Sequence, residues 1–77
     1  MKDIKVLGSG CANCKTTTAL IEQVARDKGV AVNIDKIQDM QAIIAYGVLA
    51  TPGVVVDGKV VHAGGVPPRD KIEAWLA

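Results

Sequence analysis

The sequence predicts an α/β fold in which a mixed four-stranded sheet is flanked by three helices, in the order βαβαββα. Three observations predict it. Short β-branched runs alternate with segments of helical periodicity, an Asp-Gly pair separates two valine-rich runs, and no repeat or low-complexity linker interrupts the chain. A βαβ unit followed by a helix and a hairpin gives such a mixed sheet. We therefore expect residues 1–77 to form a single domain.

The first strand is predicted at residues 4–7, which are apolar-rich and β-branched. Gly8-Ser9-Gly10 then ends it with residues that tolerate unusual dihedral angles. Beyond position 14, apolar residues recur at helical spacing until Lys28-Gly29, which supplies a cation and a glycine stop. These apolar positions are Leu20, Ile21, Val24 and Ala25. A long helix should follow the first strand.

The middle of the chain predicts a strand and a short helix. Residues 30–37 alternate apolar and polar side chains, as a strand does. Asp39 is a candidate N-cap for the helix, and Gly47 is its expected stop. The apolar residues at helical spacing in this segment are Met40, Ile43, Ile44 and Val48.

A hairpin and a final helix complete the predicted fold. Residues 54–56 and 60–63 flank Asp57-Gly58, and Asp-Gly between β-branched runs is a strong hairpin signal. Pro67-Pro68 suits the entrance of a helix. Its apolar stripe should comprise Ile72, Trp75 and Leu76.

The two cysteines of the chain, Cys11 and Cys14, open the first helix. Positions three apart on a helix are neighbours, so the two sulfurs can come within reach of a disulfide. The helix N-terminus and Lys15 both favour thiolate over thiol. Cysteines so placed titrate between ~3.5 and ~7.5 instead of ~8.5. We predict redox chemistry in which Cys11 is the nucleophile and Cys14, one turn inside the helix, is the resolving thiol.

The C-x-x-C after the first strand, Thr51-Pro52 before the hairpin and the element order together resemble a minimal thioredoxin or glutaredoxin fold over nearly the entire chain. More narrowly, the chain is similar to short archaeal- and bacterial-type thioredoxin-like proteins with a Gly-Cys-x-x-Cys loop. The resemblance implies a thiol–disulfide oxidoreductase. It also implies that Pro52 is cis beside the cysteines and that Thr51 offers its backbone N–H and C=O to an extended substrate.

The chain departs from the two familiar loops of that superfamily. Thioredoxins have Trp-Cys-Gly-Pro-Cys and glutaredoxins Cys-Pro-Tyr-Cys, whereas Gly10 stands in front here and Ala12-Asn13 lies between the cysteines. We expect Ala12, Asn13 and Lys15 to tune the pKa of the thiolate. Lys5 stands six residues before Cys11, where thioredoxins carry a buried aspartate, and is expected to point to solvent or toward the site.

Other interpretations stay open at this point. The cysteines could be two buried apolar residues, or a soft-metal site for Cu(I) or Zn(II), or part of a scaffold with little turnover. Small heavy-metal domains run βαββαβ and end in a strand, unlike the order predicted here, so we favour redox chemistry and expect no metal. Pro52 could instead begin a strand. His62 is expected to face solvent, and Tyr46 and Trp75 to serve in packing.

Composition narrows the expected partners. The net charge is +1 and the basic residues form no run, so we expect neither nucleic-acid nor membrane binding. No stretch approaches the roughly 20 apolar residues of a membrane span, and the chain as given predicts a cytoplasmic protein. We expect a monomer that needs no cofactor, acts on protein disulfides, and receives electrons from a reductase or a small thiol such as glutathione.

Overall fold

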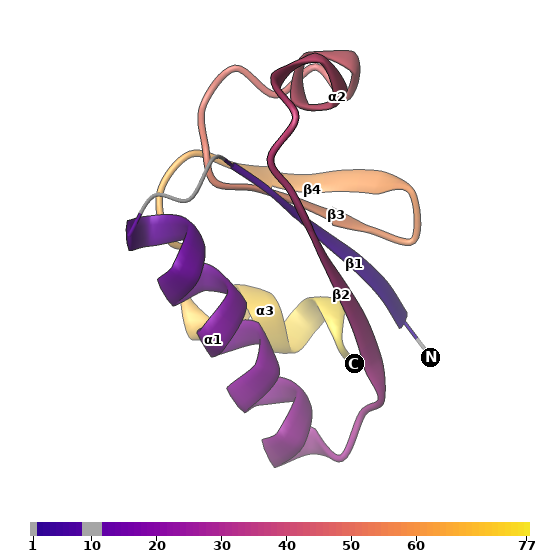
Figure 1. Cartoon of the computed structure of the whole chain (residues 1–77). Coiled ribbons are helices and arrows are strands. Elements are labelled where there is room, and N and C mark those ends of the chain that lie inside the picture. The colour runs from indigo at the N-terminus through magenta and orange to yellow at the C-terminus, as the bar shows by residue number, and fades with distance from the viewer. Residues whose placement is uncertain (1, 9–11) are drawn as a thin grey trace.

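A computed structural model of the chain describes residues 2–8 and 12–77. The described residues form four strands and three helices in the order βαβαββα, which confirms the predicted fold class (Figure 1). The elements are β1 (Lys2–Leu7), α1 (Ala12–Lys28), β2 (Val32–Ile37), α2 (Met40–Ala45), β3 (Gly53–Val56), β4 (Lys59–Ala63) and α3 (Arg69–Trp75).

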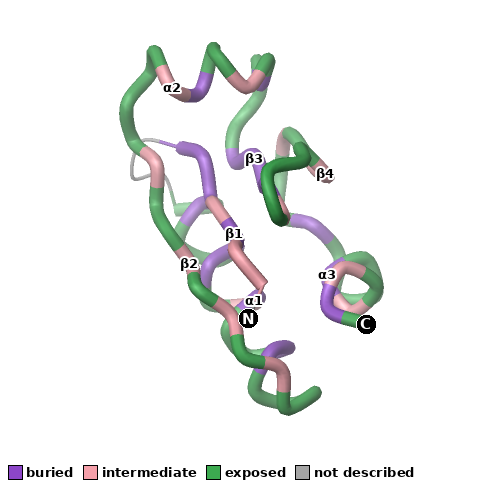
Figure 2. The backbone as a smooth tube through the Cα atoms, turned by 90° about the vertical axis from the view of Figure 1, so that its right-hand side faces the viewer, coloured by how far each residue is buried: buried purple, intermediate pink, exposed green. Residues whose placement is uncertain are grey.

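The sheet is mixed, with strand order β2-β1-β3-β4. β1 runs parallel to β2 and antiparallel to β3, and β3 and β4 form the antiparallel hairpin. α1 makes the crossover that a parallel pair requires. β1 and β3 are therefore the central strands, and Figure 2 shows buried segments gathered there while β2 is half-buried or exposed.

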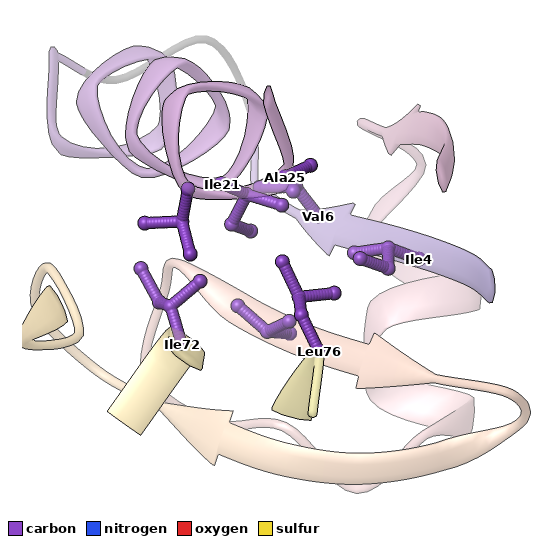
Figure 3. Close-up of a cluster of buried hydrophobic side chains, with 8 residues drawn as sticks. Ile4, Val6, Ile21, Ala25, Ile72 and Leu76 are labelled. Atoms are coloured by element: carbon purple, nitrogen blue, oxygen red, sulfur yellow. The ribbon is translucent and has the colours of Figure 1, made fainter. Parts of the chain in front are cut away.

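Two apolar clusters lie on opposite faces of this sheet, because successive side chains of a strand point to opposite sides. The larger one joins α1 and α3 to the sheet: in Figure 3, Ile72 and Leu76 of α3 point toward Ile4 and Val6 of β1 and toward Ile21 of α1. The smaller cluster lies under α2 and consists of Leu7, Ile43, Val48 and Val55. Cys14, on α1, thus belongs to the face that α1 and α3 cover.

The hairpin prediction is confirmed by its dihedral angles. Asp57 has φ 50° and Gly58 has φ 85°, the two positive values that a type I′ turn requires. The Asp57 N–H donates to the carbonyl of Asp3 at 2.8 Å, and the Asp3 N–H donates to Oδ1 of Asp57 at 3.0 Å. The turn is therefore held against the start of β1.

The ends of α1 and α2 follow the predicted signals. Gly29 has φ 66° and Gly47 has φ 77°, as expected of glycines that stop helices. The Asp39 side chain caps α2 by accepting from the Gln41 N–H at 3.1 Å. The Val30 N–H donates to the carbonyl of Ala25 at 2.9 Å, so Val30 takes part in capping the C-terminal end of α1, two residues beyond Lys28. For that reason the second strand begins later than predicted.

The apolar stripe expected on the second helix is only partly buried. Ile43 is buried, whereas Met40 and Ile44 are 57% and 59% exposed. With six residues, α2 buries little more than one side chain against the sheet. None of the described helices is long and apolar enough to cross a membrane.

An ion pair ties α1 to α3: Nη2 of Arg69 lies 2.7 Å from Oδ2 of Asp27. The hydrogen bond from Arg69 holds the pKa of Asp27 below its ordinary value. A lowered pKa in the folded state stabilises the fold above the ordinary pKa of aspartate, and this contribution is lost as pH falls through the folded pKa. We expect Asp27→Asn to lower the free energy of unfolding near neutral pH and to lose this effect in acid, below the folded-state pKa of Asp27.

Urea unfolding at both pH values measures this difference. Glu22→Gln, on the same helix, is the control for removing an acidic charge from α1. A deficit of Asp27→Asn that persisted unchanged in acid would contradict the assignment.

Candidate active site

The first turn of α1 carries the predicted resolving cysteine. Cys14 is buried, with 6% of its surface exposed, although it is only two residues from Ala12, where α1 begins. Ala12, Asn13 and Lys15, predicted to tune the thiolate, are exposed around it. The predicted nucleophile, Cys11, lies outside the described residues. The first turn therefore places one buried sulfur among exposed neighbours.

Three consecutive threonines secure this turn. The hydroxyl of Thr16 donates to the carbonyl of Ala12 at 3.0 Å, that of Thr17 to Asn13 at 2.7 Å, and that of Thr18 to Cys14 at 3.0 Å. Thr17 and Thr18 are buried, so these bonds also satisfy hydroxyls that solvent does not reach. The backbone around Cys14 is thus held by side chains of its own helix.

Gly8 lies where β1, Cys14 and Thr51 meet. A Cβ at position 8 would overlap Sγ of Cys14 and would lie 3.5 Å from Cβ of Thr51. The sequence prediction ascribed Gly8 to unusual dihedral angles, but it is not among the described glycines with positive φ. Its role is instead to leave room for the sulfur. The absence of a side chain here brings Cys14 and Thr51 together.

The second predicted segment of the site, Thr51-Pro52, adjoins the same junction. The Thr51–Pro52 peptide bond is cis, Pro52 is buried and Thr51 is exposed. The carbonyl of Pro52 accepts a hydrogen bond from the Gly64 N–H at 2.9 Å. Thr51 is 37 positions downstream of Cys14 in the sequence. It nevertheless lies beside the first turn of α1, because β3, which follows Pro52, pairs with β1.

A small cavity of about 70 Å³ opens beside Cys14 on the α1 face. Its polar lining comes from Lys15, Thr18, Lys36 and Gln38, and Gly8 and Val6 also line it. Lys36 comes from β2, where it is aligned with Val6 of β1. A space of that size holds about two water molecules. Lys36 and Gln38 were not singled out from the sequence, because their proximity to Cys14 depends on the pairing of β2 with β1.

The charge around Cys14 suits a thiolate. The N-terminal end of α1 carries the partial positive charge of a 17-residue helix, and no acidic residue in its first turn offsets it. Lys15 and Lys36 add two ammonium groups around the adjoining cavity. Cys14 is disulfide-bonded in this structure. The arrangement can therefore hold sulfur in the oxidised state and favour thiolate in the reduced state.

Lys5 does not reach this site. It lies on β1 between Ile4 and Val6, which point into the larger cluster, so its side chain is on the opposite face from Cys14. Its Nζ is 3.0 Å from Oδ2 of Asp3 and 3.9 Å from Oδ2 of Asp35. The hydrogen bond that the Lys5 ammonium donates to the Asp3 carboxylate raises the pKa of Lys5 above its ordinary value. Of the two expected orientations, the one toward the site is wrong.

His62 was expected to face solvent, and it does so only in part. The ring is half-buried and contacts both the turn after β4 and α3, with Nε2 at 3.0 Å from the Gly65 carbonyl. Its ring centroid lies 6.2 Å from that of Trp75. Tyr46 packs against the smaller apolar cluster and Trp75 against the larger one, as predicted. Within residues 2–8 and 12–77, no group of three or more potential metal ligands is gathered.

The sequence of this chain is similar to those of known proteins. Residues 2–77 match the family model described as a thioredoxin domain. A thioredoxin of Methanothermobacter thermautotrophicus is 31% identical over 77 residues, which cover all of both chains. A thioredoxin of Methanocaldococcus jannaschii is 30% identical over 73 residues, covering 95% of this chain and 84% of that protein.

Solved structures agree on the fold. Chloroplastic thioredoxin z superposes with a TM-score of 0.73 at 19% identity, covering 99% of this chain and 75% of its own. Oxidised mitochondrial thioredoxin 3 from Saccharomyces cerevisiae gives 0.69 at 17% identity, covering 97% and 76%. The thioredoxin-like fold class is confirmed, and the protein is a thiol–disulfide oxidoreductase. The chain belongs to the thioredoxin family.

Proposed function

We propose that this protein reduces protein disulfides by thiol–disulfide exchange between Cys11 and Cys14, with Cys11 as nucleophile and Cys14 as resolving thiol. The observation that carries the proposal is the setting of Cys14: a buried, disulfide-bonded sulfur in the first turn of a helix, packed against Gly8. Cys11 is the other cysteine of the sequence and directly precedes α1.

In the first step, the thiolate of Cys11 attacks one sulfur of the substrate disulfide. A Cys11–substrate mixed disulfide forms, the substrate's S–S bond breaks, and one substrate thiolate leaves. An extended substrate segment would lie along Thr51-Pro52, where the exposed Thr51 adjoins the Gly8 junction. Ala12, Asn13 and Lys15 belong to the first turn of α1, directly after Cys11, and tune the pKa of the attacking thiolate.

In the second step, the thiolate of Cys14 attacks the Cys11 sulfur. The mixed disulfide breaks, the second substrate thiolate leaves, and the Cys11–Cys14 disulfide forms. The substrate has gained two electrons and the protein has lost them. A separate reductase or a small thiol such as glutathione returns the electrons. Burial of Cys14 supports its role, because a sheltered sulfur is poorly placed to meet an incoming protein disulfide.

We further propose that residues 1–77 act as a single domain and as a monomer, since one sheet carries both apolar clusters. The cytoplasm is the proposed location, because glutathione and thioredoxin systems there keep thiols reduced. The net charge of +1 is close to zero, which supports action on proteins and gives no support to nucleic-acid or membrane binding.

Replacement of Cys14 tests the assignment of the two thiols. Cys14→Ser removes the resolving thiol, so a mixed disulfide formed through Cys11 should accumulate. Incubation with native, disulfide-bonded insulin followed by mass spectrometry without reducing agent measures the amount of mixed disulfide. We expect the covalent adduct with Cys14→Ser, no adduct with Cys11→Ser, and turnover reduced to background in both variants.

Two outcomes would contradict the proposal. Adduct formation by Cys11→Ser would exchange the two roles. Failure of the wild-type chain to form an intramolecular disulfide in a glutathione titration would remove the redox function and favour soft-metal binding through the same thiols. A reversible two-electron transition, with a tenfold change in equilibrium constant per about 30 mV, is the expected result.

A further inference from the structure

His62 lies on β4 between two partners that contact its two ring nitrogens. Nε2 lies 3.0 Å from the carbonyl oxygen of Gly65, and Nδ1 lies 3.2 Å from Nζ of Lys71 on α3. The imidazole therefore bridges the turn after β4 and the last helix. Nothing in the chemistry of the two cysteines requires this bridge.

The two contacts are consistent with one protonation state of the ring. A lysine ammonium can only donate, so Nδ1 must accept and carries no hydrogen. A carbonyl oxygen can only accept, so Nε2 must carry the hydrogen. The geometry thus selects the neutral Nε2–H tautomer. Lys71 sets the tautomer, and the tautomer makes the ring a donor to Gly65.

The Gly65 carbonyl belongs to a turn that packs on the proposed substrate segment. The Gly64 N–H donates to the carbonyl of Pro52 at 2.9 Å, and a Cβ at position 64 would lie 3.2 Å from Cβ of Ala50. Residues 50–52 and 64–65 therefore lie side by side. Gly65 and Ala50 are exposed, so an extended chain passing Thr51 would meet this turn as well.

The turn consists of two glycines in the left-handed region, with φ 83° at Gly64 and φ 71° at Gly65. Consecutive glycines have the largest conformational freedom of any residue pair. A segment that is not held in one conformation must be ordered when a ligand binds, and that cost reduces affinity. The His62 side chain removes part of this freedom in advance.

We propose that His62 is a positioning residue for substrate recognition: through Nε2–H it holds the Gly64-Gly65 turn against Ala50–Pro52, where an extended segment of a protein disulfide docks. The inference rests on the proposed docking of substrates along Thr51-Pro52. It deepens that proposal by assigning recognition of the substrate's polypeptide to a residue that does not touch the reacting sulfurs.

The test compares a protein disulfide with a small one. Steady-state reduction of insulin and of dithiobis(nitrobenzoic acid), a small aromatic disulfide, is measured for the wild type and for His62→Leu. We expect His62→Leu to raise KM for insulin about two- to tenfold, the loss of one hydrogen bond, with kcat changed less. The small aromatic disulfide needs no extended docking, so its rate should change less than the insulin rate.

Two further variants make the test specific. His62→Gln keeps an N–H donor that can reach the Gly65 carbonyl and should restore most of the insulin KM. Lys71→Met leaves the ring in place but removes the donor to Nδ1, so ¹⁵N spectra of the imidazole should show a larger share of the Nδ1–H tautomer. Lys59→Met, at an exposed position on the same strand as His62, is the control for removing a lysine charge in Lys71→Met.

The outcomes separate this inference from the proposed function. If the wild type reduces neither disulfide, the proposed function fails. If the wild type is active but His62→Leu leaves the insulin KM unchanged, or slows both disulfides equally, only the positioning role is overturned. A wild-type Nδ1–H tautomer in the ¹⁵N spectrum would also overturn it.

Discussion

Gly8→Ala is expected to slow thiol–disulfide exchange on the order of 10²-fold, the usual effect of displacing a reacting group by about 1 Å. The added Cβ would overlap Sγ of Cys14 and would also lie 3.5 Å from Cβ of Thr51, so it has little room beside the sulfur. Overpacking of this kind also costs about 1–3 kcal/mol of stability. Insulin reduction and urea unfolding of the same preparation measure both effects.

Gly53→Ala is the matched control, because its Cβ would lie 2.9 Å from Cγ1 of Val48 in the smaller apolar cluster and its three nearest neighbours would be side-chain carbons of Val48 and Leu7. Its loss of stability should be comparable, while the rate at which Cys14 resolves a mixed disulfide should be affected far less. Equal slowing in both variants would mean that general destabilisation, and not the position of Cys14, limits exchange.

Ile72→Ala is expected to cost about 2–5 kcal/mol of stability. Ile72 is fully buried and points from α3 toward α1 and β1 in the larger cluster (Figure 3). A chain of 77 residues has a total stability of about 8 kcal/mol at roughly 0.1 kcal/mol per residue. The variant should therefore lose a large part of its stability, which urea unfolding followed by Trp75 fluorescence measures.

Leu49→Ala controls for the removal of an aliphatic side chain. Leu49 is 94% exposed, so its truncation should change stability by less than about 0.5 kcal/mol. A small effect of Ile72→Ala, similar to that of Leu49→Ala, would show that α3 contributes little to the fold.

Local sequence signals predicted turns and helix ends well, because the interactions that fix them join residues close together in the sequence. Asp57-Gly58 determines a type I′ turn through two backbone dihedral angles, and Gly29 and Gly47 end helices in the same way. The Asp39 cap depends only on a residue two positions away. Met40 and Ile44 recur at helical spacing and are nevertheless exposed, because helical spacing alone cannot say how much of a six-residue helix the sheet covers.

The sequence by itself determined the order of elements, the hairpin, the helix ends and the position of Cys14 in the first turn of a helix, since each follows from residues within one turn or one strand. Only the tertiary structure decided what surrounds Cys14. The pairing of β1 with β2 and β3 brings Lys36 and Thr51 to the sulfur, and the packing of α3 brings Lys71 to His62. The role of Gly8 could be understood only from sequence and structure together. The sequence shows that position 8 has no side chain, and the folded chain shows that Sγ of Cys14 occupies the space where a side chain would lie.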